Sequence, residues 1–215
     1  MINHEKFQDI VNKDFGESFS KILRCRTLKD LCEEIESISQ NYAVYGYQDS
    51  IVDNETVEGS LKFRGDLFEI FAEIFFKIHE GDNRIGVFDY DPVKSNDDYG
   101  VDATSKNIDG LNTTIQVKFR LNPMYELVER DIKQFGLQSI VKYDVDHKQS
   151  NNMIIFTNCK GLNWGSNANV FLNIFRVING DLISRFIDNN EGFWNSMRNI
   201  ITNTLNSVGM DYVQI

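Results

Sequence analysis

The residues whose types and spacing most directly suggest chemistry are Asp102, Gln116 and Lys118. The alternation of Thr113–Arg120 predicts a strand that places Gln116 and Lys118 on one face. Asp109–Gly110 separates this strand from an earlier one and is a strong hairpin-turn signal. If the two strands pair, Asp102 lies across from the end that carries Gln116 and Lys118. A carboxylate, an amide oxygen and a lysine then meet at one edge of a sheet.

These residue types suit the hydrolysis of a phosphodiester bond. Such hydrolysis needs a cation that neutralises charge on the scissile phosphate, and a nucleophile made from water. Mg²⁺ takes oxygen ligands and keeps several waters, so one or two carboxylates and a backbone carbonyl suffice. A nearby lysine can orient or deprotonate the water and stabilise the transition state. The stretch from Asp102 to Lys118 is therefore a candidate magnesium site.

A second source of carboxylates is the predicted helix Asp66–Glu80, whose apolar residues cover most of its surface. Its polar residues step by three or four positions and form one stripe, made of Asp66, Glu69, Glu73 and Lys77. This stripe faces either solvent or a site. In the second case Glu69 completes the ligand set, and Glu73 either supports it or is an ordinary solvated acid.

Three sequence pieces occur in a fixed order: Phe68-Glu69 in the predicted helix, Asp98-Tyr99-Gly100-Val101-Asp102, and Ile115-Gln116-Val117-Lys118. This set resembles the motifs of the PD-(D/E)xK, restriction-endonuclease-like nucleases. The similarity is closest to the Mrr-like branch, in which Gln replaces the central acid. Weaker matches are Asp131–Phe135 and Asn189–Trp194. The resemblance covers roughly residues 60–205, and the first 58 residues resemble nothing that we can name.

The resemblance implies a set of roles for the matched residues. Asp102, Glu69, Gln116 and the Val117 carbonyl would hold Mg²⁺, for which Mn²⁺ would substitute, and Lys118 would act on the nucleophilic water. A further group would lie around the site or contact DNA: Glu73, Asp98, Arg120, Lys133 and Gln134. Each has a plainer interpretation, because Asp98 suits a turn, Arg120 and Lys133 suit solvated charges, and Gln134 suits a helix surface.

The pattern along the chain predicts an α/β fold. Residues 1–58 read as a helical extension, with one helix over Phe15–Ile38, which would contact the target or a second copy. Residues 59–215 would form a restriction-endonuclease-like core, a small mixed β-sheet flanked by helices. Its predicted strands are Arg84–Tyr90, Val101–Ser105, Thr113–Arg120 and a central buried one at Asn152–Thr157, with Asn169–Val177 and Asp181–Asp188 less defined. Its later helices are Glu126–Tyr143 and Glu191–Leu205, the second capped by Asn189 or Asn190.

Composition narrows the setting. No apolar run approaches the roughly 18–20 residues that span a bilayer, and Met1–Lys13 lacks the apolar core of a signal peptide. The three cysteines form no CxxC pair, and no Gly-Lys-Ser/Thr phosphate loop occurs. We therefore expect a cytoplasmic protein of a bacterial or phage-infected cell, with no membrane partner and no nucleotide cofactor. Its expected partner is double-stranded or branched DNA, and cleavage of both strands would suit a homodimer.

The acidic net charge of the chain is compatible with functions other than DNA cleavage. The net charge is −10, and residues 49–102 hold 14 acidic residues against five basic ones. The leading hypothesis is a metal-dependent DNA endonuclease with a restriction, homing or resolvase role. The acidic total and the neutral Gln116 also suit a catalytically inactive DNA- or protein-binding module that keeps the nuclease fold. A third hypothesis is a mimic of DNA phosphates that binds a basic protein without metal.

Overall fold

The computed structural model describes residues 2–3, 5–14, 17–45, 50–52, 55–57, 59–94, 100–146, 148, 152–163 and 174–207. Contacts group the chain into two compact units. The first is Met1–Ile74 with Ser184–Ile215, and the second is Phe75–Ile183. This grouping differs from a division after residue 58, which stays a prediction.

The first unit is mainly helical, as the sequence predicts for the N-terminal extension. Its elements are α1 (Glu5–Asp14), α2 (Glu17–Ile22), α3 (Leu28–Ser39), the 3₁₀ turn η1 (Tyr42–Tyr45), the antiparallel strands β1 (Ser50–Val52) and β2 (Glu55–Val57), most of α4 (Gly59–Ile78) and α8 (Glu191–Ser207). The β1–β2 hairpin was not predicted from the sequence.

The single helix predicted over Phe15–Ile38 is wrong, because α2 ends at Ile22 and α3 starts afresh at Leu28. A capping box starts α3. The Asp30 N–H donates to the Thr27 hydroxyl at 3.0 Å, and the Thr27 N–H donates to Asp30 Oδ2 at 3.0 Å. This reciprocal pair satisfies two of the helix's otherwise unpaired N–H groups, so Thr27 marks a new helix start.

Helix α4 begins at Gly59, seven residues before the predicted start, and is buried on most sides as its sequence indicates. The stripe of acids predicted on it does not simply face solvent, since Asp66 and Glu73 are buried.

The cap of helix α8 is the one that the sequence predicts. The N–H of Phe193 donates to Asn190 Oδ1 at 3.1 Å, which confirms Asn190 as the cap.

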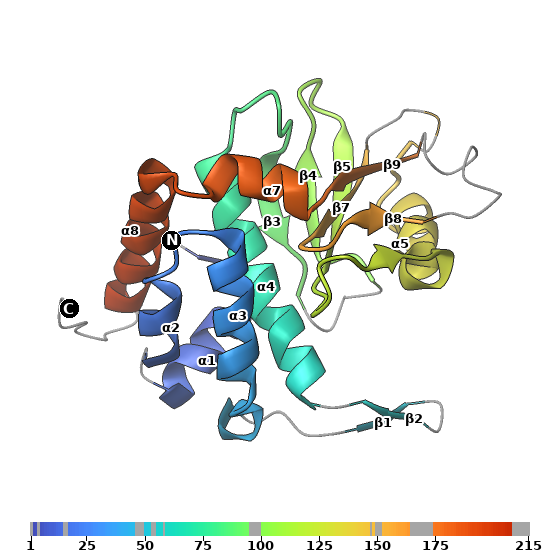
Figure 1. Ribbon diagram of the computed structural model, residues 1–215. Coiled ribbons are helices and arrows are strands. Elements are labelled where there is room, and N and C mark those ends of the chain that lie inside the picture. Colours follow the sequence, from blue (N-terminus) through green and yellow to red (C-terminus); the bar gives the residue numbers. More distant parts are fainter. Residues whose placement is uncertain are drawn as a thin grey trace. The chain divides into compact units, whose positions relative to one another are not determined.

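The second unit is built on a mixed five-stranded sheet in the order β3-β4-β5-β7-β9, seen together in Figure 1. The strands are β3 (Phe88–Pro92), β4 (Ala103–Lys106), β5 (Asn112–Lys118), β7 (Met153–Thr157) and β9 (Phe175–Ile178). Strand β4 runs antiparallel to both of its neighbours, β3 and β5, while β7 is parallel to both β5 and β9. The chain is therefore α/β, as predicted, and β7 is the fully buried strand expected at Asn152–Thr157.

The other elements of this unit are the parallel pair β6 (Glu126–Leu127) and β8 (Gly161–Leu162), helix α5 (Glu129–Val141), and the start of α7 (Gly180–Ile187). The predicted helix Glu126–Tyr143 starts three residues late because its first residues pair with β8. The strand predicted at Arg84–Tyr90 is displaced to β3, because Ile85 and Gly86 donate to the Asp82 carbonyl in a turn. The segment Asp181–Asp188 is largely α7, and residues 169–173 lie outside the described residues.

The hairpin of β4 and β5 forms as predicted, with Ala103 opposite Ile115 and Lys106 opposite Asn112. Its turn uses a left-handed Gly110 (φ 76°), which a glycine adopts without steric penalty. Both faces of β5 are buried, because α5 packs against the polar one and the Thr114 hydroxyl donates to the Ser139 hydroxyl at 2.7 Å.

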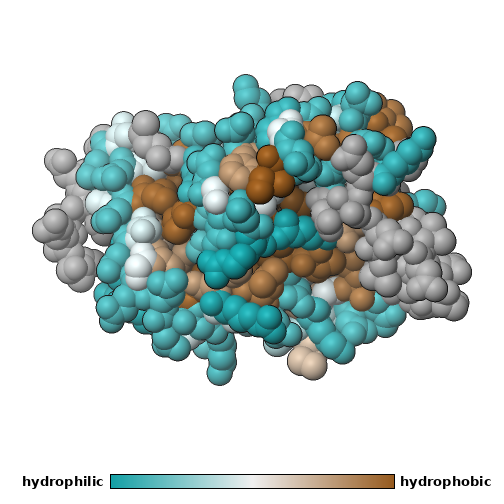
Figure 2. Space-filling model, turned by 90° about the horizontal axis from the view of Figure 1, so that it is seen from above, coloured by the Kyte–Doolittle hydropathy of each residue, from teal (hydrophilic) through white to brown (hydrophobic). Residues whose placement is uncertain are grey.

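No helix in the described ranges combines the length and apolar character needed to cross a bilayer. On the face viewed in Figure 2, hydrophobic side chains reach the surface in several places with hydrophilic ones between them. In the described part of the chain, seven of the eight exposed large hydrophobic residues belong to the second unit: Ile108, Leu111, Leu121, Met124, Leu137, Ile140 and Val141.

Candidate functional site

The hairpin brings Asp102 beside the end of β5, which is the placement that the sequence predicts. The Asp102 N–H donates to the Ile115 carbonyl at 2.9 Å, so Asp102 continues the β4–β5 ladder by one residue. Its side chain turns toward β5, where Oδ2 accepts the Val117 N–H at 2.5 Å. Asp102 is 9% exposed. A buried carboxylate is thus fixed against the Gln116–Val117 peptide.

The Gln116 side chain is 3% exposed and lies on the face of β5 that α5 covers. Its Nε2 donates to the Gly100 carbonyl at 2.9 Å. Its Oε1 is buried and accepts no hydrogen bond within the described part of the chain. A buried acceptor without a donor costs about 1–3 kcal/mol, so native structures seldom keep one without a reason. An amide oxygen is also a ligand for a hard cation.

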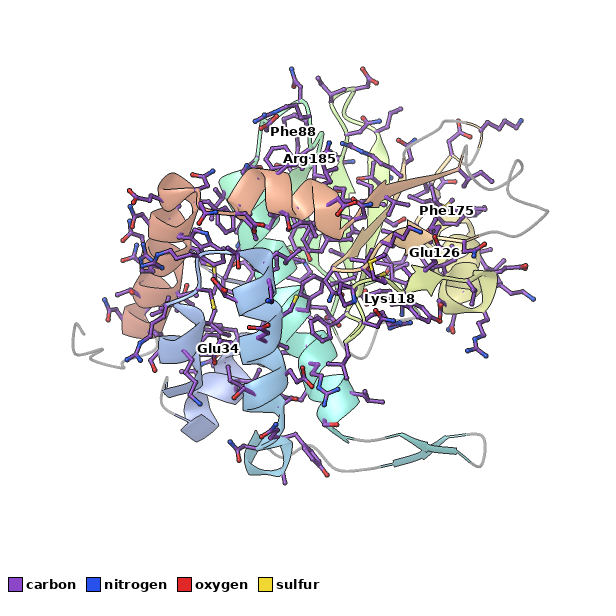
Figure 3. All side chains as sticks on the ribbon, viewed as in Figure 1. Glu34, Phe88, Lys118, Glu126, Phe175 and Arg185 are labelled. Atoms are coloured by element: carbon purple, nitrogen blue, oxygen red, sulfur yellow. The ribbon has the colours of Figure 1, made fainter. Side chains whose placement is uncertain are left out.

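Lys118, labelled in Figure 3, is the last residue of β5. It follows Gln116 by two residues, so the two side chains lie on the same face of the strand. Its carbonyl accepts the Thr157 hydroxyl at 2.7 Å, which ties the end of β5 to β7. The side chain is half-buried, and no hydrogen bond or ion pair joins its ammonium to another described residue. A positive charge with no bound acid beside it can interact with a substrate phosphate or a water.

The part of α5 around Gln134 lies close to Gly100 and Gln116. A β-carbon on Gly100 would lie 3.6 Å from both Gln116 Nε2 and Gln134 Cγ, and 3.5 Å from the Phe135 N atom. The first half of α5 therefore covers the Gly100–Gln116 contact. Gln134 and Lys133 are themselves exposed, which agrees with the plainer interpretation of both.

Arg120 is engaged in a network that the sequence did not reveal. Its guanidinium pairs with Asp131 at 3.2 Å and lies 5.4 Å from the centre of the Tyr125 ring. The Tyr125 hydroxyl donates to Asp131 Oδ2 at 3.3 Å, and so does the Val128 N–H at 2.9 Å, at the start of α5. Arg120 therefore anchors α5 to the end of β5. The sequence feature that indicates this contact is Asp131, an acid at the third position of α5, where such a residue often caps the helix.

Asn158 binds the backbone of Arg120, just after the end of β5. The Arg120 N–H donates to Asn158 Oδ1 at 2.8 Å, and Asn158 Nδ2 donates back to the Arg120 carbonyl at 2.6 Å. This reciprocal pair fixes the backbone just after Lys118. The sequence offered no sign of it, because the two residues are 38 positions apart.

The acids of α4 belong to the first unit and have partners there. Lys6 of α1 lies 2.6 Å from Asp66 Oδ1 and 2.8 Å from Glu69 Oε2. Glu73 is fully buried, and its Oε1 accepts the Asn3 N–H at 2.5 Å. The solvated interpretation of Glu73 is therefore wrong. Glu69 remains a predicted ligand, but a metal ion would have to replace the Lys6 ammonium beside it.

The charge environment of Lys6 follows from these contacts. Burial by itself would lower the pKa of Lys6. The carboxylates of Glu69 and Asp66 outweigh burial and hold that pKa above the ordinary lysine value. Lys6 is therefore charged at neutral pH, and its contacts with Asp66 and Glu69 are ion pairs.

The oxygen donors at Asp102 suit a hard divalent cation that keeps most of its waters. They are one carboxylate, the unpaired Gln116 Oε1 and the Val117 carbonyl, and all are oxygens. Across the described ranges, no group of three or more His, Cys, Asp or Glu residues is arranged to hold a metal ion. Asp98, the other acid predicted near Asp102, lies outside the described residues.

A hollow of about 420 Å³ lies along β3, β4 and β5. Its lining includes Thr104, which shares a face of β4 with Asp102 two residues earlier. It also includes Asp89, a left-handed residue (φ 52°) at a bulge in β3, and Asp91. The lining also includes Lys106, so the hollow carries two carboxylates and one ammonium. The sequence did not predict this hollow.

Neither the models of known protein families nor the curated proteins gave a match to this chain.

Proposed function

We propose that this chain is a metal-dependent DNA endonuclease with a restriction-endonuclease-like core. The observation that carries the proposal is the buried Gln116 Oε1, which lacks a donor among the described residues and lies in the strand that binds Asp102. Lys118 follows two residues later on the same face. This combination of a carboxylate, an amide oxygen without a donor among the described residues, and an ammonium suits phosphodiester hydrolysis better than a purely structural role.

Each group has a separate task in this proposal. Asp102 and Gln116, with the Val117 carbonyl, would hold Mg²⁺. Bound there, Mg²⁺ supplies positive charge against the scissile phosphate. The Lys118 ammonium orients the attacking water and offsets negative charge as the phosphorus gains its fifth oxygen. The Val117 N–H keeps the Asp102 carboxylate in position.

The test uses supercoiled, linear and branched DNA, each incubated with Mg²⁺, Mn²⁺ or EDTA. We expect the wild type to cut only with metal, and Lys118→Ala to lose cleavage while it still binds DNA. Lys29→Ala is the matched control, because Lys29 is 81% exposed on α3 and pairs only weakly with Glu33 at 3.7 Å. If both lysine variants cut as well as the wild type, Lys118 has no part in the reaction.

A second candidate is a binding module that retains the fold without activity. It is favoured by the single carboxylate of the described ligand set, which already accepts the Val117 N–H. Such a module would bind DNA or a protein equally well in EDTA and Mg²⁺, and it would cut no substrate. The same incubations therefore distinguish it from the nuclease.

A further inference from the structure

Gly100 has a backbone conformation that few other residues adopt. Its φ is 87°, in the left-handed region where a side chain meets its own backbone. In this conformation its carbonyl accepts Gln116 Nε2 at 2.9 Å. The two residues are 16 positions apart, so this contact depends on the fold and not on local chain geometry.

This contact determines which way the Gln116 amide faces. A carbonyl oxygen can only accept hydrogen bonds, so the amide nitrogen has to lie against Gly100. The amide oxygen must then point away from it. The opposite orientation would set two acceptors against each other and lose the bond. The unpaired position of Oε1 is thus a consequence of the Gly100 carbonyl.

We propose that Gly100 is a positioning residue that fixes the Gln116 amide with its oxygen available to a divalent cation. The inference rests on the proposed function, and it adds a residue that touches neither metal nor substrate. It also explains why an amide suits position 116. An amide donates to Gly100 at every pH, whereas a carboxyl group there must be protonated to do so.

The first test compares two glycine variants. Gly100→Ala and Gly110→Ala both place a side chain on a left-handed residue, at φ 87° and 76°. A β-carbon on Gly110 meets no atom within 4 Å, so this variant controls for backbone strain alone. Mn²⁺ affinity is measured by calorimetry without DNA, and thermal melting shows that both variants fold. We expect Gly100→Ala to weaken Mn²⁺ binding about tenfold or more, and Gly110→Ala to leave it nearly unchanged.

The second test needs neither metal nor DNA and compares the same two glycine variants by NMR. The side-chain amide resonances of Gln116 report the bond to Gly100, because a hydrogen-bonded amide proton exchanges slowly. We expect this exchange to be slow in the wild type and in Gly110→Ala, and faster in Gly100→Ala.

The outcomes separate the inference from the function. If the wild type binds Mn²⁺ and cuts DNA while Gly100→Ala matches Gly110→Ala, the positioning role is overturned and the nuclease stands. Equal exchange rates of the Gln116 amide protons in Gly100→Ala and Gly110→Ala would overturn it as well. If the wild type binds no Mn²⁺ and cuts no DNA, the proposed function fails and this inference fails with it.

Discussion

The acids of α4 and the site beside β5 both combine buried side-chain oxygens with a lysine, but they differ in how those oxygens are hydrogen-bonded. In the first unit, Asp66 and Glu69 share the Lys6 ammonium, and Glu73 accepts a backbone N–H. In the second unit, Asp102 accepts the Val117 N–H as well, but Oε1 of Gln116, the residue before Val117, has no donor in the described part of the chain. Hydrogen-bond partners account for the acids of α4, whereas the proposed ligand site rests on Gln116 Oε1, which has no donor among the described residues.

The largest expected effect concerns Asp102. Asp102→Asn keeps an oxygen that can accept the Val117 N–H, so we expect the melting temperature to change little. Because the ligand charge is lost, we expect cleavage to fall by about 100–1000-fold, as for other single groups that stabilise a transition state. Plasmid cleavage rates and melting curves of the same preparations check this. A variant that cuts normally would remove Asp102 from the site.

The next effect concerns the first unit. Lys6→Met removes the cation from two carboxylates whose side chains are only 5% and 13% exposed. Removing one partner of a buried ion pair costs about 3 kcal/mol or more, so we expect the free energy of unfolding in urea to drop by that amount. Lys29→Met, on an exposed pair, should change it by less than about 1 kcal/mol. Equal effects would mean that the Lys6 pair is no stronger than a surface contact.

A smaller effect is expected for Asp131→Ala. This change removes the acceptor of the Val128 N–H at the start of α5, together with the partner of Arg120. Loss of a helix cap costs about 1 kcal/mol, and the half-exposed ion pair adds little. We expect a decrease of about 1–2 kcal/mol in unfolding free energy, with a faster hydrogen exchange in the first turn of α5. Unchanged exchange there would show that Asp131 does not hold this helix end.

The smallest effect is a dependence on pH. The pKa of Lys6 is raised in the folded protein, so its stabilising contribution is complete below the ordinary lysine value of about 10.4 and declines as pH rises toward the folded value. We expect the stability difference between the wild type and Lys6→Met to shrink above that pH. Urea unfolding of both proteins in alkaline buffers measures it. A difference that stays constant would contradict an ion pair at Lys6.

The sequence predicted well where local patterns carry the information. The alternation of β5, the Asp109–Gly110 turn and the apolar run of β7 each follow from neighbouring residues, and the structure contains all three. The position of Asp102 opposite the end of β5 could be predicted because the register of a hairpin can be counted from its turn.

What the sequence could not show depends on contacts between distant residues. The pairing of Lys6 with α4 spans 60 or more positions, and no spacing rule relates them. The bond from Gln116 to Gly100 needed the left-handed backbone of Gly100, which a Gly in a motif does not by itself reveal. The start of α3 is a different case, since the Thr27–Asp30 capping pattern is local and can be recognised from the sequence.

The measurement that tests the central claim most directly is the conversion of supercoiled plasmid DNA by the wild-type protein in Mg²⁺, with a parallel reaction in EDTA. A metal-dependent endonuclease predicts nicked or linear product in Mg²⁺ and none in EDTA. If duplex and branched DNA both stay intact in Mg²⁺ and Mn²⁺ while the protein is folded, the proposed endonuclease function is contradicted.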